Sequence, residues 1–492
     1  MEGNQLQKDM ELQQLIFELF ETQIKFGAHR YGELLPTIKE VSSYFLASVD
    51  TVRLAYIRLK QEGYITLSTC VGAVVKVSYT DSEIQQHIQG YFSSRKESLL
   101  AFAQSVGILS SYVQWFALKN AAPETLDKLE RSCTQIEILP VYRMSQQLQL
   151  IFSPLGNDLL LRLFWQMFLF FQAPLVSIPQ NINVINSSSS PLLDMIQSAR
   201  NKDWTELWKG VEITAEKYFI GLQTFFNNHI PLNADDIQID FTWSIYKKTS
   251  QVCYSICLDL MLKICDGVYK AGDFLPSPKE LATENKVGIK TIRRTVTLLN
   301  KMGVTRSVNG IGTKVLKPSE SQNNCDFSDA TIQKRLLDFL QSLHILSLTC
   351  RRCAKITICS VDLNCKNQLI EQLEMVKVSG AYERIIYVCN EFISLHIPFQ
   401  PLRSVYAKLV QQLVWGYPLN LHGDRESTNA YFLPYLESLE ECLKEDDADK
   451  FSIILERLQT VETNFTAQWL INLGVQEASA LIIPNDKLIV IS

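Results

Sequence analysis

The chain repeats part of itself at a fixed distance of 240 positions. Residues 30–77 align with residues 270–317 over 48 positions without a gap. An internal repeat of this kind fixes the domain layout before any local pattern is considered, and 492 residues suggest roughly two to four domains. The identical pairs are Gly32/Gly272, Leu35/Leu275, Pro36/Pro276, Lys39/Lys279, Glu40/Glu280, Thr51/Thr291, Arg53/Arg293, Leu59/Leu299, Gly63/Gly303, Gly72/Gly312 and Val75/Val315.

The first copy has the pattern of three helices followed by a hairpin. Apolar residues spaced three and four apart predict a helix over 10–27, and Gly27 is placed to end it. Thr37 can cap a short helix over Ile38–Leu46, and a third helix is expected over Val49–Gln61 until Gly63 stops it. This third helix should turn Val52, Ala55, Tyr56 and Leu59 inward and Asp50, Thr51, Arg53 and Arg58 outward. Two β-type runs, 64–67 and 73–77, then flank a turn at Gly72.

The second copy predicts the same order of elements. Helices are expected over 250–268, up to about Asn285 after the turn at Pro276, and over 289–302, with a hairpin reaching Lys317. Three helices and a two-stranded hairpin form a winged helix-turn-helix. Its third helix can enter a DNA major groove, which is about 12 Å wide, while the hairpin touches the backbone or the minor groove.

The repeated residues resemble the DNA-binding domain of GntR-type bacterial transcription regulators. The second copy has the fuller motif: Gly272, Leu275, Pro276, Ser277, Lys279, Glu280, Leu281, Ala282, Thr291, Ile292, Arg293, Leu299, Gly303, Gly310, Gly312 and Thr313. The first copy has a thinner version: Gly32, Leu35, Pro36, Lys39, Glu40, Thr51, Val52, Arg53, Leu59, Gly63 and Gly72. The resemblance implies a regulator that binds double-stranded DNA, with a second domain that binds a small-molecule effector and dimerises.

Two long segments, 80–243 and 319–492, are predicted to be such helical domains. Apolar residues recur at helical spacing over 108–118, 126–138, 148–152, 159–171, 204–226, 331–348, 405–413, 431–443 and 451–470. Loops are expected at 174–191, 319–324 and 397–401, and a short hairpin or strand at 480–491. In length and helicity the segments resemble the FCD class of effector domains. The prediction is therefore a mainly α chain of four domains: winged helices at 1–79 and 244–318, helical domains at 80–243 and 319–492.

Local charge indicates where DNA would be bound. Residues 270–317 hold ten Lys and Arg against three acidic residues, a net +7, in a chain whose net charge is −5. Such local positive charge is what the neutralisation of phosphates requires. The candidate DNA contacts of the second copy are Ser277, Lys279, Lys290, Thr291, Arg293, Arg294, Arg306 and Lys314. An Arg at the start of the third helix can bond guanine through two hydrogen bonds, and residues at the start of the second helix face phosphates.

The first copy departs from this pattern. Residues 30–77 carry only +2, from six Lys and Arg against four acidic residues, and Asp50 stands where repulsion from phosphates would be felt. Its candidate contacts are Thr37, Lys39, Ser48, Thr51 and Arg53. We expect weaker DNA contact with a different base preference, or a winged helix retained for packing or for contact with a partner.

Sites for metals and catalysis find little support in the sequence. Cys350 and Cys353, followed by Cys359 and Cys365, have the first half of a zinc-ligand spacing but lack a second close pair. The six histidines are scattered, so the metal triad of FCD-like domains cannot be transferred. No phosphate-binding loop, nucleophile elbow or carboxylate pair is readable, so no cofactor and no enzymatic activity are expected. Tryptophans cluster in the first helical segment, which favours a packed core over an apolar ligand pocket.

The sequence favours a cytoplasmic transcription regulator, for example a repressor, in which one chain acts as a covalent pseudo-dimer on two unlike half-sites. The start of the chain has no apolar export signal, and the apolar stretch Leu159–Ile178 carries Arg162 and Pro174, which favours a core helix over a membrane span. Further pairing into homodimers is possible. A protein-interaction scaffold and an architectural DNA-binding protein remain as alternatives that would reuse the same winged helices.

Overall fold

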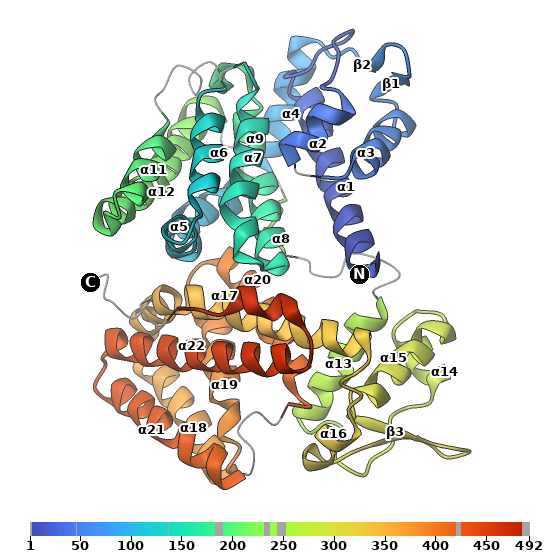
Figure 1. Ribbon diagram of the computed structural model, residues 1–492, viewed down its shortest axis with the longest axis vertical. Helices are drawn as coiled ribbons and strands as arrows, with labels where there is room; N and C mark the ends of the chain where they lie inside the picture. Colours follow the sequence, from blue (N-terminus) through green and yellow to red (C-terminus); the bar gives the residue numbers. More distant parts are fainter. Residues whose placement is uncertain are drawn as a thin grey trace. The chain divides into compact units, whose positions relative to one another are not determined.

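The computed structural model describes residues 2–45, 47–135, 137–182, 190–230, 237–243, 252–419 and 425–484. The chain forms two compact units, unit 1 (Met1–Phe241) and unit 2 (Thr242–Ser492) (Figure 1). Helices dominate both, and the sheets among the described residues are two antiparallel hairpins, so the predicted mainly α fold is confirmed. The boundary between the units lies two residues before the predicted boundary at 243/244; the finer division into four domains stays a prediction.

Unit 1 begins with three helices and a hairpin. The helices are α1 (Glu2–Lys25), α2 (Ile38–Phe45) and α3 (Val49–Gln61), and the strands are β1 (Ile65–Ser68) and β2 (Gly72–Val75). Gly27 and Gly63, each at a positive φ, end α1 and α3 as expected. The four residues predicted to face inward from α3 are all buried.

Unit 2 begins with the same order of elements. Its helices are α13 (Val252–Cys265), α14 (Pro278–Glu284) and α15 (Ile289–Lys301), and its strands are β3 (Thr305–Val308) and β4 (Gly312–Val315). The bounds of α15, β3 and β4 lie 240 positions after those of α3, β1 and β2. Strand register repeats as well, because Ile65 faces Val75 and Thr305 faces Val315.

A helical segment follows each of these parts. In unit 1 it comprises α4 (Asp81–Ser93), α5 (Lys96–Lys119), α6 (Pro123–Cys133), α7 (Pro140–Phe152), α8 (Asp158–Met167), a π-helical turn (Phe168–Gln172), α9 (Ala173–Val176), α11 (Pro191–Arg200) and α12 (Trp204–His229). In unit 2 it comprises α16 (Pro318–Asn324), α17 (Ala330–Ser360), α18 (Leu363–Ser379), α19 (Ile385–His396), α20 (Gln400–Leu413), α21 (Arg425–Lys444) and α22 (Ala448–Asn472). The long helices pair in both segments, α5 with α12 and α17 with α22.

The apolar stretch of unit 1 is a core helix. Among the described residues, Asp158–Val176 is the one helix long and apolar enough to cross a membrane by length and composition, and 67% of it is buried inside the protein. Its Trp165 stacks on Phe45 of α2, with ring centroids 5.4 Å apart. This packing agrees with the interpretation as a buried helix.

Several local predictions were wrong. Thr51 is only 1% exposed and does not lie on the outward face of α3, because its hydroxyl bonds Ser48 at the start of the helix. Residues 319–324, expected as a loop, belong to α16, and α9 occupies the start of the loop expected at 174–191. The expected strand near the C-terminus begins in a 3₁₀ helix (Gln476–Leu481), and its residues 485–491 lie outside the described part of the chain.

Candidate nucleic-acid interface

We call the three helices and the hairpin that begin each unit its winged part. The second helix of each winged part starts in a capping box. Ser277 accepts a hydrogen bond from the Glu280 backbone N–H at 3.3 Å, and the Glu280 carboxylate accepts one from the Ser277 N–H at 2.7 Å. Thr37 and Glu40 make the same pair of bonds in unit 1. These bonds fix the start of the helix. Lys39 and Lys279 follow on the exposed side.

The exposed face of α15 is cationic. Lys290, Arg293 and Arg294 are exposed, and within the described part of the chain none of their side chains forms a hydrogen bond or an ion pair. Behind this face, Thr295 is buried and donates to the Cys253 carbonyl of α13 at 3.2 Å, while Thr291 is half-buried. The cations of α15 are therefore held on a braced helix with their charge free for a ligand.

The exposed face of α3 differs in charge. Arg53 is exposed but forms an ion pair with Asp50, one helical turn before it. Ser48 caps the helix by accepting from the Thr51 N–H at 3.1 Å, so both hydroxyl side chains at this end are engaged in the cap. Of the predicted contacts on α3, only Arg53 thus offers a charge to DNA, and that charge is already partnered.

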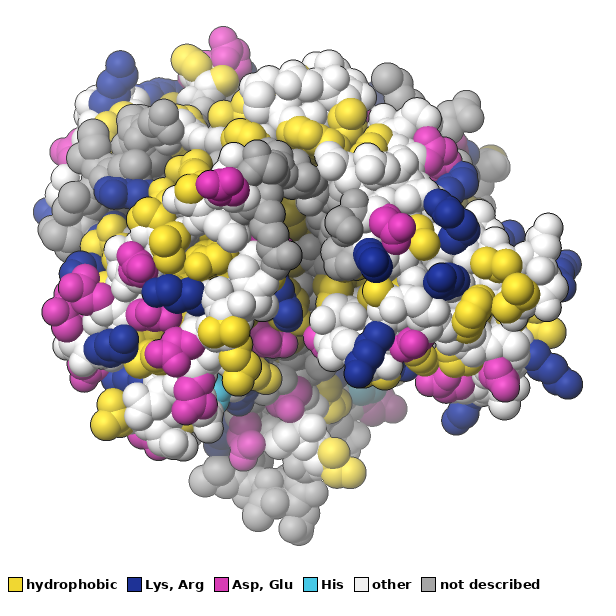
Figure 2. Space-filling model, turned by 90° about the horizontal axis from the view of Figure 1, so that it is seen from below, with side chains coloured by type: hydrophobic (Ala, Val, Ile, Leu, Met, Phe, Trp, Pro, Cys, Tyr) yellow, Lys and Arg dark blue, Asp and Glu magenta, His cyan; other side chains and the backbone are white. Residues whose placement is uncertain are grey.

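The hairpins repeat this contrast. Register places Arg306 opposite Lys314 in unit 2, where unit 1 has Thr66 opposite Val74. Like charges directly opposite each other destabilise a hairpin, so an anion bound between these two side chains would reduce their repulsion. Arg306 also donates to Asn324 of α16. The lobe at the right of Figure 2 holds this winged part, and dark blue Lys and Arg side chains gather on it among apolar ones.

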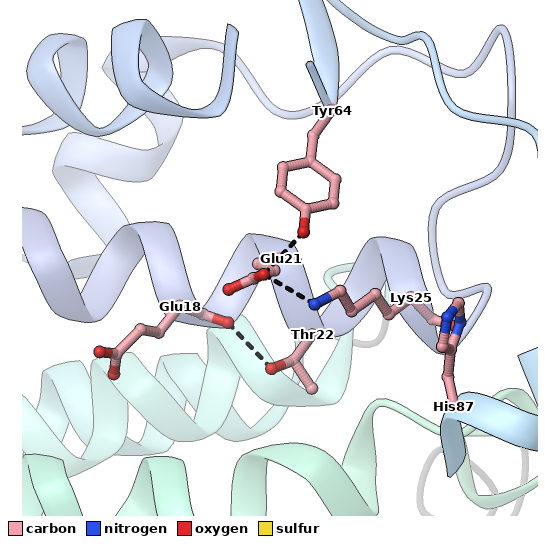
Figure 3. A network of polar contacts seen from close by, with 6 residues as sticks. All are labelled: Glu18, Glu21, Thr22, Lys25, Tyr64 and His87. Carbon is pink, nitrogen blue, oxygen red and sulfur yellow. Dashed lines mark hydrogen bonds and ion pairs between the residues drawn. The ribbon is translucent and has the colours of Figure 1, made fainter. Parts of the chain in front are cut away.

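A polar network joins Tyr64, the residue before strand β1, to helix α1 (Figure 3). Tyr64 donates to the Glu21 carboxylate at 2.7 Å, and Lys25 pairs with the same oxygen at 2.8 Å. Burial opposes the charge of Glu21, but the bonds from Lys25 and Tyr64 outweigh it and lower the pKa of Glu21. At the matching positions 261, 265 and 304, unit 2 has Met, Cys and Val, which belong to or pack against one apolar core cluster.

The two winged parts are joined to their helical segments in different ways. In unit 1, the buried Tyr142 of α7 donates to Gln23 at 2.7 Å and lies 2.8 Å from His29, and its ring stacks on Tyr44 of α2. Burial lowers the pKa of His29 to about 4 against a smaller opposing effect of Glu33. Helix α2 is packed against the helical segment through both Tyr44 and Phe45, because Phe45 stacks on Trp165 of α8.

Unit 2 uses its first helix for the same attachment. The Arg335 guanidinium of α17 lies 4.4 Å from the ring of Tyr254 on α13 and pairs with Asp338 at 2.7 Å. Both charges of this pair are buried, and the cation–π contact with Tyr254 adds to the attraction between them. Positions 284 and 285, which match Tyr44 and Phe45, are an exposed Glu at the end of α14 and a half-buried Asn just after it.

The cysteines do not gather into a metal site in the part of the chain that the structure describes. No group of three or more His, Cys, Asp or Glu side chains there could hold a metal ion. Cys350 and Cys353 are buried in α17, and burial raises the pKa of Cys353 to about 12. Trp115 and Trp208 of the first helical segment pack edge to face, as core residues do.

Three helices followed by an antiparallel hairpin define the winged helix-turn-helix class of DNA-binding domain. Residues 12–75 match the protein family described as "Bacterial regulatory proteins, gntR family". The chain therefore carries a GntR-family DNA-binding domain in unit 1, as its motif predicted. The match covers the copy with the thinner motif.

Three solved structures align with this chain over nearly their own full length. "Streptococcus agalactiae GntR" is 17% identical and covers 43% of this chain and 98% of its own, with a TM-score of 0.20. The structure titled "Lar controls the expression of the Listeria monocytogenes agr system and mediates virulence" is 15% identical over 46% and 99%, with a TM-score of 0.22. "E. coli McbR/YncC" is 15% identical over 45% and 98%, with a TM-score of 0.16. No curated protein matches the chain significantly in sequence.

Proposed function

We propose that this protein is a non-enzymatic, cytoplasmic transcription regulator that binds double-stranded DNA mainly through the winged part of unit 2. The observation that carries the proposal is the cationic face of α15, where Lys290, Arg293 and Arg294 are exposed without a partner among the described residues. Lys314 and Arg306 extend this charge onto the hairpin. Phosphates would supply the missing counter-charge.

The two winged parts would act together as a pseudo-dimer on one chain. Their matching element bounds support an origin by tandem duplication, and their third helices carry different residues at the same positions. Such a chain would bind two unlike half-sites, and linking both modules raises the effective concentration of the second after the first has bound. The helical segments would then hold the effector and change the separation of the modules.

Unit 1 supports a route for that regulation. Tyr142 and Trp165 belong to the helical segment, yet they contact His29 and Phe45 of the winged part directly. An effector that shifts α7 or α8 would therefore move α2 with it, because packed aromatic side chains transmit a shift rather than absorb it.

Salt dependence of binding tests the proposal. Arg293→Ala combined with Arg294→Ala should weaken affinity for a bound duplex by about 2–6 kcal/mol if both bond guanine, and should lower the slope of log K against log salt by up to about 2, because both charges enter the groove between the phosphates. The matched control is Lys355→Ala with Lys377→Ala, which removes two exposed cations that pair with Asp449 and Glu437 on the helical segment. This control changes net charge equally and should leave the slope unchanged.

An unchanged slope in the arginine variant would contradict the assignment of DNA binding to α15. If no duplex is bound at low salt by the parent chain, a protein-binding role for the winged parts would replace it. Footprinting on genomic DNA separates a regulator from an architectural protein, since a regulator protects a compact site.

A further inference from the structure

The third helix of unit 1 exposes apolar side chains where that of unit 2 exposes polar ones. Val49, Leu54 and Ile57 are 45%, 47% and 36% exposed. At the positions 240 residues later, the chain has Ile289, Arg294 and Thr297. Only the first of the three pairs keeps its apolar character, so the difference is concentrated at Leu54 and Ile57.

At the start of α3 the charge on this face is cancelled within the helix, and exposed Lys60 remains as a cation near the end of the helix. Asp50 and Arg53 form an ion pair, and Asp50 replaces the cationic Lys290 of α15. The adjacent hairpin adds no charge, because Thr66 faces Val74 there. A groove-reading helix of this kind would depend on contacts with bases more than on attraction to phosphates.

The pattern fits a DNA groove better than a protein partner. Acidic residues are depleted from the cores of protein interfaces, whereas Asp50 stands between the exposed apolar residues Val49 and Leu54 in the sequence of α3. In the major groove, apolar side chains have a specific target in the C5-methyl group of thymine, while arginine bonds guanine. A mixed face of apolar groups and one internal ion pair can therefore lie against a run of A·T pairs.

We propose that α3 recognises a thymine-rich half-site through Leu54 and Ile57, while α15 recognises a guanine-containing half-site through Arg293 and Arg294. The inference rests on the proposed function, since it assigns base preference to the two modules of the pseudo-dimer. It predicts an operator whose two halves differ in base composition and in the chemical group that each helix contacts.

The experiment replaces thymine by uracil, which removes the C5-methyl group and leaves every hydrogen-bonding group of the base in place. Duplexes are first selected from random sequence with the full chain at low salt, and the enriched site is resynthesised with uracil in its A·T-rich half. Affinity of the parent protein should fall about fourfold for each methyl group that α3 buries. Uracil in the guanine-containing half should have no such effect.

Two variants test which helix is responsible for the sensitivity to uracil. In Leu54→Ala the sensitivity to uracil should shrink severalfold, and in Arg293→Ala it should persist although overall affinity drops. Leu54 is half exposed, so its truncation leaves the fold intact. Selection of two equally guanine-rich halves, or equal uracil sensitivity in parent and Leu54→Ala, would overturn the inference while leaving DNA binding in place. Failure to enrich any duplex would overturn the proposed function as well.

Discussion

The third helix of unit 1 carries a net charge of +2, from three Lys and Arg and one acidic residue, while the third helix of unit 2 carries +4, from four Lys and Arg and no acidic residue. Tyr44 and Phe45 attach α2 to the helical segment through Tyr142 and Trp165. The matching positions of unit 2 are Glu284 and Asn285, and α13 makes the attachment through Tyr254 instead. The same order of elements is thus combined with aromatic packing of α2 in unit 1 and with more positive charge in unit 2. The lesson is that residues outside the fold-determining set decide how each copy is used.

The largest expected difference concerns Phe45. Phe45→Ala removes a fully buried ring that stacks on Trp165, which should destabilise the winged part of unit 1 by about 3–5 kcal/mol. Asn285→Ala, at the matching position of unit 2, removes one hydrogen bond to the Leu281 carbonyl and should cost about 1 kcal/mol. Hydrogen exchange measured by mass spectrometry reports each unit separately. Equal losses of protection would break the comparison, and Phe45→Leu should restore most of the stability.

A second difference lies at the glycine after the third helix. Gly303 has φ +69°, and a Cβ there would come within 2.2 Å of the Ser321 carbonyl oxygen in α16. Gly63 has φ +85° with open space around it. Gly63→Ala should therefore cost only the backbone penalty of about 1–2 kcal/mol, and Gly303→Ala about 1–3 kcal/mol more from the clash. Faster exchange across α16 in Gly303→Ala alone would sharpen the comparison; identical effects at both glycines would contradict it.

A third difference depends on pH. His29 of unit 1 has its pKa lowered to about 4, mainly by burial, and the matching position of unit 2 is Tyr269. A histidine whose folded-state pKa is below its unfolded value of about 6.5 contributes stability that is present above pH 6.5 and is lost as the pH falls towards 4. The parent should lose up to about 3 kcal/mol more than His29→Gln over that range, all of it in unit 1. Parallel pH profiles for the two proteins would rule out this role of His29.

Capping residues and glycines in the sequence made the helix and strand bounds of the winged parts predictable to within a few residues. Helix α3 begins and ends where the sequence predicted, because the cap at Ser48 and the stop at Gly63 act locally. Helix α16 was missed because its Ser, Gln and Asn residues are typical of loops, although Pro318 favours a helix start. Helix α18 was missed because exposed apolar residues, among them Met375 and Val378, obscure its apolar stripe.

The candidate interface was predictable in its charges but less so in its partners. The free cations of α15 follow from residue type, and the Asp50–Arg53 pair could have been expected from its spacing of three on a helix. Thr51 misled because a helix-start hydroxyl can turn inward to serve the cap. The contacts of His29 with Tyr142 and of Phe45 with Trp165 join residues more than 100 positions apart, and no local pattern encodes them.

If both winged parts bind DNA as proposed, the presence of α3 and α15 on one polypeptide changes how DNA recognition would evolve. In a symmetric dimer every substitution in the recognition helix appears twice, so both halves of the operator must change together. Here a substitution at Arg294 leaves Leu54 untouched, because the two positions are separate codons. In such a regulator one half of the binding site could therefore change in sequence while the other half still binds the protein.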